Sequence, residues 1–286
     1  MLKIHNINKN ITLEFDNINY VLHEEDIGSI ESTHYTSKAL NQNGSYLTNT
    51  TLENREINIT GYIVSDVPAE MNNKRKHLIE LVNPLDRIYV IKNRLKVECK
   101  ANSTVGFSSN YKDNNNYVCK FNISLFCANP FWNNINDLKS DIALWKPKLR
   151  FPVIIPKNRG VILGLKEPSL ITNIVNNGDT EIGMRIEFRA KGALTNPSLF
   201  NINTREEFKV EKSMIAGEKI VVNTTFGNKR VEHFLNGTIS NGFRYIKRGS
   251  TFLQLDIGDN LFRYNADTNI DNLEVTIYYN PNILEV

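Results

Sequence analysis

Short runs of alternating apolar and polar residues recur along this chain, separated by polar turns that contain glycine or asparagine. In GMRIEFRA (residues 183–190), the apolar side chains occupy the even positions and the charged side chains the odd ones. A period of two is typical of a β-strand with one buried face and one solvated face. Turns at 177–179, 216–218 and 226–228 each contain a glycine, which tolerates the positive φ of tight hairpins. The pattern predicts an antiparallel β module across residues 171–235.

The N-terminal half has the same alternation, except in one weakly periodic polar stretch. Strands are predicted at residues 11–15, 18–22, 55–64, 87–92, 95–101 and 117–128. Residues 24–54 are polar and weakly periodic, and we interpret them as long loops or an extended hairpin arm. A segment of this length without strong periodicity is usually functional or mobile. Gly61 interrupts the apolar face of its strand, which predicts a bulge or a close backbone approach.

One helix is predicted, beginning at Pro68 and ending before Pro84. Its apolar stripe consists of Met71, Leu78, Ile79 and Val82, opposite a basic triplet at 74–76. We interpret the triplet as a solvated helix face rather than as a docking patch.

A domain boundary is predicted near residue 145, because periodicity drops between 134 and 158 and Pro147, Pro152 and Pro156 cluster there. The domains are then residues 1–144 and 145–286. The second half continues with hairpin turns at 236–237 and 241–242, a turn at 258–260 and a closing strand, LEVTIYY. The predicted class is mainly β, with an N-terminal β-sandwich that carries one helix and a C-terminal antiparallel β-sandwich.

Composition adds few constraints. The 286 residues are 41% apolar and 23% charged, which fits one large or two ordinary packed domains. A formal charge of +3 does not favour nucleic-acid binding. The first residues contain no apolar signal core, and no apolar run approaches the ~20 residues of a membrane helix. We therefore expect a soluble protein made in a cytoplasm.

The three cysteines contain no C-x-x-C pair. Cys119 and Cys127 share the apolar face of one predicted strand, where eight residues span roughly 27 Å, too far for a disulfide. We interpret all three cysteines as reduced, small hydrophobic residues rather than as metal ligands.

Catalytic constellations are absent from the sequence. Gly-x-Ser-x-Gly, His-Glu-x-x-His, P-loop and dinucleotide-loop patterns do not occur. Residues 265–271 alternate oxygen-bearing side chains as a calcium loop does, but counted from Asp267 the sixth position is Asn272 and the twelfth is Tyr278, where glycine and glutamate are required. We predict a hairpin loop there and expect no enzyme, no cofactor and no catalytic, cofactor-binding or metal-binding residue.

Several ordered segments resemble a known family. They are R-x-I-x-I-x-G at 55–61, CANPFW at 127–132, NPSLFN at 196–201, IAGEKIVVNT at 215–224, GNKRV at 227–231 and F-L-x-L-x-x-G-x-N at 252–260. Together they look like the phage distal tail proteins, also called the siphovirus-type tail component family, over most of the chain.

The resemblance implies a function that the composition does not reveal. In that family, N-terminal domains close into a hexameric ring that continues the tail tube, and galectin-like C-terminal β-sandwiches project outward as attachment points. It implies a structural component of the virion tail tip or baseplate, assembled in the host cytoplasm. Its partners would be copies of itself, the tail tube protein, and tip, fibre or receptor-binding proteins, with no membrane or nucleic acid. The arm at 24–54 would contact a neighbouring subunit or the tube.

An alternative is a glycan-binding module at the tail tip, by analogy with galectins. Sugar sites usually present an aromatic ring beside convergent polar groups. Trp132 and Trp145 are the available tryptophans, although both lie near the predicted boundary, where packing is the expected role.

Overall fold

The computed structural model describes residues 2–142, 145–147, 164–166 and 171–286. It divides into two compact units, one of Met1–Ile135 with Ile283–Val286 and one of Asn136–Asn282. The division precedes the boundary predicted at residue 145, because Ile142 already packs in the core of the second unit. Of the residues on which that boundary was predicted, Pro152, Pro156 and the side chain of Trp145 lie outside the described part.

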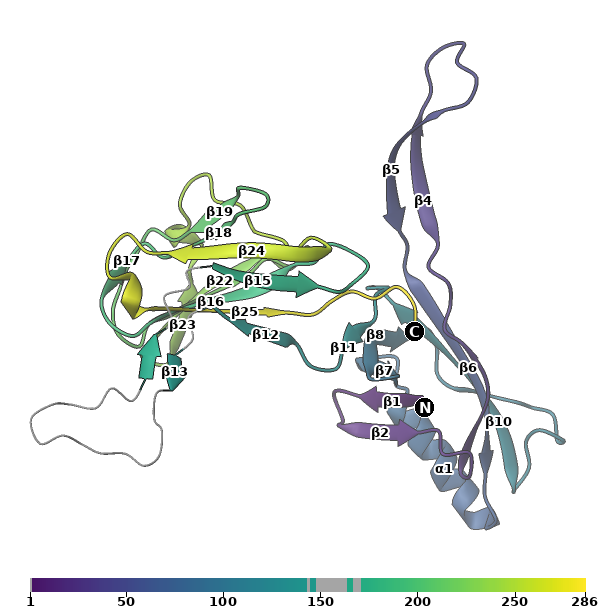
Figure 1. The fold of residues 1–286 in the computed structure, drawn as a ribbon. Coiled ribbons are helices and arrows are strands. Elements are labelled where there is room, and N and C mark those ends of the chain that lie inside the picture. Colours follow the sequence, from purple (N-terminus) through teal and green to yellow (C-terminus); the bar gives the residue numbers. More distant parts are fainter. Residues whose placement is uncertain (1, 143–144, 148–163, 167–170) are drawn as a thin grey trace, which may run out of the picture. The chain divides into compact units, whose positions relative to one another are not determined.

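The first unit, predicted as a β-sandwich with one helix, joins its strands into one nine-stranded antiparallel sheet (Figure 1). Its central order is β2-β1-β7-β8-β10-β6-β3, with β9 beside β10 and β11 beside β8. The strands are β1 (Lys3–Asn6), β2 (Ile11–Glu14), β3 (Tyr20–Asp26), β6 (Arg55–Val64), β7 (Ile88–Lys92), β8 (Leu95–Ala101), β9 (Gly106–Phe107), β10 (Val118–Cys127) and β11 (Asn133–Asn134).

Helix α1 (Pro68–Leu81) confirms the predicted helix and packs into the core of this unit through Met71, Leu78 and Leu81. Ile79, predicted on the buried stripe, is 44% exposed, so its assignment was wrong; Leu81 is buried instead.

The basic triplet of α1 is only partly solvated. Lys74 Nζ donates to Asn19 Oδ1 and to the carbonyl of Val64, at 2.9 and 2.8 Å. The Arg75 guanidinium donates to Asn114. The prediction of a solvated face is therefore wrong for these two side chains, which tie the helix to neighbouring loops, and holds for Lys76, whose side chain is 77% exposed.

Gly61 is required by close packing. A Cβ atom at this position would lie 2.5 Å from both the carbonyl oxygen of Val21 and the Phe121 ring. The pairing of β3 with β6 also shifts register between Leu22 and Glu24, beside Gly61. The expected close approach is confirmed, whereas the extra residue of the bulge lies in β3, opposite Gly61, and not in the strand of Gly61.

The second unit is a sandwich of two antiparallel sheets whose inner faces form one hydrophobic core. The six-stranded sheet has the order β12-β25-β16-β21-β22-β23 and the four-stranded sheet β15-β24-β18-β19. The strands are β12 (Leu138–Asp141), β15 (Ile171–Asn176), β16 (Met184–Ala190), β18 (Ser198–Asn201), β19 (Glu207–Lys209), β21 (Lys219–Asn223), β22 (Arg230–Leu235), β23 (Thr238–Asn241), β24 (Gly258–Asn265) and β25 (Leu273–Tyr279). Smaller pairs are β13 (Trp145–Pro147) with β14 (Gly164–Lys166), and β17 (Leu194–Thr195) with β20 (Ser213–Met214). Two short 3-10 helices, η1 (Phe243–Tyr245) and η2 (Ile270–Asn272), complete the unit.

The mainly β class and the C-terminal sandwich are confirmed, as is the buried face of β16. The turn predicted at 258–260 is wrong. Gly258 has a φ of +88°, but it already pairs with Asn176, so these residues begin β24. In the described residues no helix is long and apolar enough to cross a membrane.

Candidate functional site

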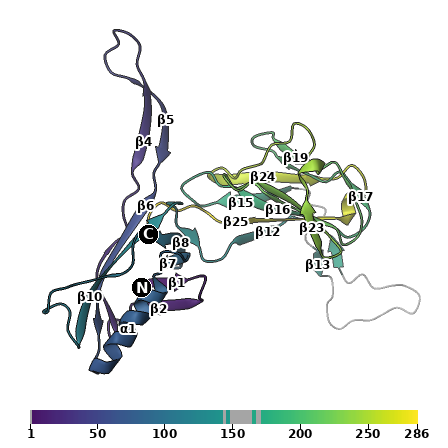
Figure 2. The same cartoon turned by 180° about the vertical axis from the view of Figure 1, so that it is seen from behind.

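A two-stranded ribbon is the most exposed element of the first unit. Strands β4 (Ser32–Ser37) and β5 (Tyr46–Leu52) pair only with each other among the strands that the structure describes. Every residue from 34 to 50 is exposed. The ribbon extends beyond β6, away from α1, in both views (Figures 1 and 2). We call residues 32–52 the arm. The ribbon confirms the hairpin arm predicted within residues 24–54; the first residues of that range belong to the end of β3 and to a short linker.

The chemistry of the arm is unusual for an exposed ribbon. Leu40 and Tyr46 are 95% and 71% exposed, and Tyr35 and Leu47 are more than half exposed. Lys38 is the one formally charged residue of the arm when His34 is neutral. Exposed strand edges are usually protected by charged side chains, proline or a covering element, and an isolated two-stranded hairpin is only marginally stable in water. The arm therefore has the properties of a segment that binds another polypeptide.

Arg55 anchors the root of the arm. Its side chain is buried, with 2% of its surface exposed. The guanidinium donates to the carbonyls of Pro130 at 2.8 Å, Gly28 at 2.8 Å and Ile27 at 3.3 Å, and also to that of Leu284. Burial lowers the pKa of Arg55 from its usual value. One side chain thus joins the linker before the arm, the turn after β10 and the C-terminal segment.

Gly28 makes the close approach at this root possible. It has a φ of +70°, and a Cβ atom there would lie 2.0 Å from the carbonyl oxygen of Glu56. Its amide donates to Asp26 Oδ1 at 2.9 Å, which closes a tight turn at the end of β3.

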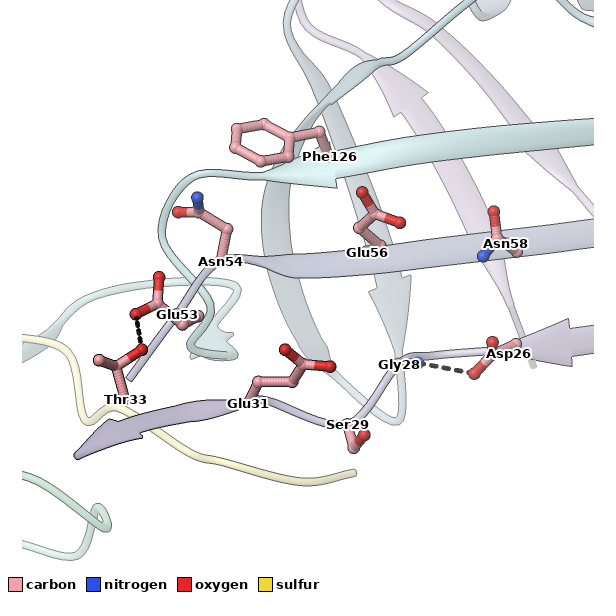
Figure 3. Close-up of a pocket in the computed structure, with 10 residues that line it drawn as sticks. All are labelled: Asp26, Gly28, Ser29, Glu31, Thr33, Glu53, Asn54, Glu56, Asn58 and Phe126. Atoms are coloured by element: carbon pink, nitrogen blue, oxygen red, sulfur yellow. Dashed lines mark hydrogen bonds between the residues drawn. The ribbon is translucent and has the colours of Figure 1, made fainter. Parts of the chain in front are cut away.

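A pocket of about 820 Å³ opens beside this turn (Figure 3). Its walls come from the linker between β3 and β4, the start of β6, and Phe126 on β10. The lining residues are Asp26, Gly28, Ser29, Glu31, Thr33, Glu53, Asn54, Glu56, Asn58 and Phe126. The Thr33 hydroxyl on β4 donates at 2.5 Å to Oε1 of Glu53, the residue that follows β5.

The lining includes four carboxylates and no lysine or arginine, so the pocket attracts cations. No group of three or more histidine, cysteine or acidic side chains in the described residues is placed to hold a metal ion. Separated carboxylates along an open pocket fit lysine or arginine side chains of a protein partner. We call this feature the acidic pocket.

The second unit also has an exposed surface of distinct character. Phe226 is 91% exposed and Phe243 44%. The Lys229 ammonium lies 5.3 Å from the ring centroid of Phe252, and that ring lies 6.3 Å from the ring of Phe243. The exposed lysines and arginines of the segment 226–252, none of which forms an ion pair with a residue that the structure describes, are Lys229, Arg230, Arg244, Lys247 and Arg248. We call residues 226–252 the basic–aromatic surface.

The structure does not make a ligand site of the calcium-loop candidate or of Trp132. Asp267, the position from which a calcium loop at 265–271 would be counted, accepts from Lys209 Nζ at 2.6 Å and from Asn196 Nδ2 at 2.8 Å. Trp132 is fully buried, so it offers no ring to a sugar. The side chain of Trp145 lies outside the described residues.

Comparison with known proteins assigns both halves of the chain. Residues 10–127 match the model of the phage tail protein RIFT-related domain, and residues 177–282 match that of the siphovirus-type tail component, C-terminal domain. A comparison with curated proteins finds no match. The two matched segments define a component of a phage tail.

Among solved structures, the phage SPP1 Dit protein, described as a paradigm of the hub adsorption apparatus in phages that infect Gram-positive bacteria, superposes with a TM-score of 0.68. The match covers 99% of each chain at 10% identity, and it supports the fold. Chains of the phage P2 baseplate, in activated conformations with calcium and with strontium, match over 97% of each chain with TM-scores of 0.48 and 0.49 and identities of 11% and 12%. The chain belongs to the siphovirus-type distal tail proteins, a structural and non-enzymatic family of phage tails.

The sequence alone does not identify Arg55 as the residue that anchors the arm. The available signal was an arginine at the head of an alternating apolar strand, where its position on the buried face is unfavourable unless every N–H finds an acceptor. The acceptors come from three distant segments, so the sequence could not identify them.

Proposed function

We propose that this chain forms a hexameric ring at the tail tip, which joins the tail tube to tip, fibre or receptor-binding proteins. The first unit would form the ring and the second would carry the attached proteins. This proposal is supported by the two matches to families of phage tail proteins and by the similarity of the whole fold to that of SPP1 Dit.

The observation that carries the proposal is the arm. A ribbon with open backbone edges and exposed tyrosines and leucines is stabilised when a second polypeptide covers it. A contact in which one surface of a subunit binds a different surface of the next forms a closed ring when the rotation closes. In the proposed ring the arm lies on the neighbouring copy, and the acidic pocket at its root binds cationic side chains there.

The test compares the oligomeric state of three proteins by native mass spectrometry and negative-stain imaging. Wild type, alone or with the tail tube protein, should form six-fold rings. A triple variant, Tyr35→Thr, Tyr46→Thr and Leu47→Thr, keeps strand-forming residues but removes the exposed apolar surface, and it should stay monomeric and folded, with the Tm of monomeric wild type.

The matched control is Leu85→Thr, which changes a leucine that is 85% exposed in the same unit but outside the arm. It should form rings as wild type does. Monomers of wild type under every condition would refute the ring, whereas rings formed by the triple variant would refute the role of the arm.

The acidic pocket has its own test. Replacing Glu53 and Glu56 with glutamine removes two charges from the pocket and should weaken ring assembly several-fold at low salt, with a smaller difference at high salt. Glu24→Gln, an exposed carboxylate outside the pocket lining, is the control. Equal ring stability in all three proteins at low salt would rule out a charged contact at this site.

The basic–aromatic surface is our candidate attachment face of the second unit. Exposed phenylalanines beside cations fit a protein partner with an apolar recess and acidic rim. Phe226→Ser with Lys229→Glu should leave rings intact and release tip proteins from assembled tails; tails of normal composition would contradict this assignment.

A further inference from the structure

Two of the three cysteines lie opposite each other on neighbouring strands. The antiparallel register of β10 with β8 pairs Leu125 with Ala101 and Phe126 with Lys100, so the next pair is Cys127 with Cys99. Both side chains are buried, at 0% and 2% exposure, and their Sγ atoms are 2.6 Å apart. Directly opposed residues of antiparallel strands have Cα atoms about 4.5–5.5 Å apart, within the range that disulfides span.

Cys119 provides an internal comparison. It is buried on the same strand, but its register partner is Ile63, and its Sγ atom lies 3.8 Å from the carbonyl oxygen of Lys120. The structure thus distinguishes a paired dithiol from a single buried thiol.

We propose that Cys99 and Cys127 form a disulfide when the tail leaves the reducing cytoplasm. Each thiol loses its hydrogen and one S–S bond forms; the two electrons and two protons pass to dioxygen, which becomes hydrogen peroxide. Dioxygen is the oxidant because it is small and apolar and can reach sulfurs buried in a hydrophobic core. A cytoplasm keeps such pairs reduced, so the time of oxidation rests on the proposed function, whereas the pairing itself rests on geometry alone.

The surroundings set the rate of this reaction. The thiol hydrogen bond to Cys127 and burial both raise the pKa of Cys99, so its thiolate is scarce at neutral pH. Because the thiolate is the reactive form, oxidation should accelerate as pH rises.

A disulfide at this position would also affect the arm. Cys127 is also the register partner of Arg55, on the opposite side of β10 from β8. A covalent bond between β8 and β10 would therefore fix the strand against which the root of the arm is anchored.

Peptide mapping tests the pairing directly. Cleavage after lysine places the three cysteines in three different peptides, residues 97–100, 113–120 and 121–139. Protein purified in air is alkylated under denaturing conditions without reductant, digested and analysed by mass spectrometry. We expect peptides 97–100 and 121–139 joined and peptide 113–120 alkylated. Three alkylated peptides, or a linkage that includes Cys119, would overturn the proposal.

Cysteine variants supply a second measurement. Wild type and Cys119→Ala should each lose roughly 5–10 °C of Tm on addition of a reductant, because reduction opens the loop that the disulfide closes. Cys99→Ala should show no such shift. A reductant response of Cys99→Ala equal to that of wild type would contradict the assignment. A protein that forms the disulfide but no rings would refute the proposed function and leave this inference standing.

Discussion

At the scale of single residues, the arm depends on one buried cation. All hydrogen-bond acceptors that the structure gives the Arg55 guanidinium are backbone carbonyls. A planar guanidinium can satisfy several acceptors in fixed directions, which a lysine ammonium cannot do. Removing it leaves carbonyls of three segments unpaired in a buried site, and each unpaired group carries a desolvation cost.

We therefore predict that Arg55→Leu destabilises the first unit by about 3–5 kcal/mol and that Arg55→Lys restores only part of this loss. Urea unfolding of the full chain measures both. Arg87→Gln is the control, because Arg87 binds Glu98 at the surface, where an ion pair contributes about 1 kcal/mol or less. Equal losses for Arg55→Leu and Arg87→Gln would contradict the anchoring role.

A second buried charge lies in the other unit. Glu218, in the family-like segment IAGE, is 1% exposed. It accepts from Lys212 Nζ at 2.8 Å, from the Ile215 amide at 2.9 Å and from His233. Burial alone would raise the pKa of Glu218, but hydrogen bonds from Lys212, Ile215 and His233 outweigh it and the pKa is lowered.

This shift predicts a pH dependence with a definite sign. A carboxyl group whose pKa is lower in the folded than in the unfolded state stabilises the folded state. This contribution is complete above the unfolded pKa, about 4.3, and is lost as the pH falls through the folded pKa. Glu218→Gln should cost about 2–4 kcal/mol at pH 7, and the difference from wild type should shrink below pH 4. Chemical unfolding at several pH values measures it; a difference that grows on acidification would contradict the argument.

At the scale of elements, the sequence predicted what periodicity alone decides. β6, β10 and β16 have strong periods, and Pro68 and Pro84 mark the ends of the predicted helix; all four elements form. The failures occur where tertiary contacts decide. Lys74 and Arg75 look like solvent-facing positions of a helix, but acceptors on distant loops bind them. Gly258 has a turn residue's positive φ, yet backbone pairing with β15 makes it part of a strand.

The turn at the root of the arm gives a prediction at this scale. Gly28 and Gly44 both have positive φ, but a Cβ atom at Gly44 has nothing within 4 Å, whereas one at Gly28 meets the Glu56 carbonyl. Gly44→Ala should cost ~1 kcal/mol, the penalty for left-handed backbone alone. Gly28→Ala should cost more than twice as much and impair ring assembly. Equal Tm values and equal assembly of the two variants would show that the close approach is unimportant.

At the scale of the whole molecule, the last four residues of the chain belong to the first unit. Residues 283–286 leave the second unit and join the first, where Ile283 and Trp132 exchange two backbone hydrogen bonds of 2.9 Å each. No local pattern in the last residues reveals this contact, because the partner of Ile283, Trp132, lies about 150 residues earlier and that of Leu284, Arg55, lies 229 residues earlier. The arm was predictable as a polar insertion, but the acidic pocket was not, since its walls come from three segments.

Removing residues 283–286 therefore tests the division into two units. The deletion should lower the unfolding temperature of the first unit, because it removes the Ile283 hydrogen bonds and an acceptor of Arg55. The transition of the second unit should not change. Differential scanning calorimetry of the full chain and the deletion variant separates the two transitions, and a selective loss in the second unit would contradict the division.

In the proposed assembly, the surface of this protein binds further copies of the chain at the end of a phage tail. The most direct measurement is electron cryomicroscopy of assembled tails in which this subunit is located. We expect six copies in a ring at the end of the tube, each with its arm against the neighbouring copy. A single copy at the tip, or a ring in which every arm points into solvent, would contradict it.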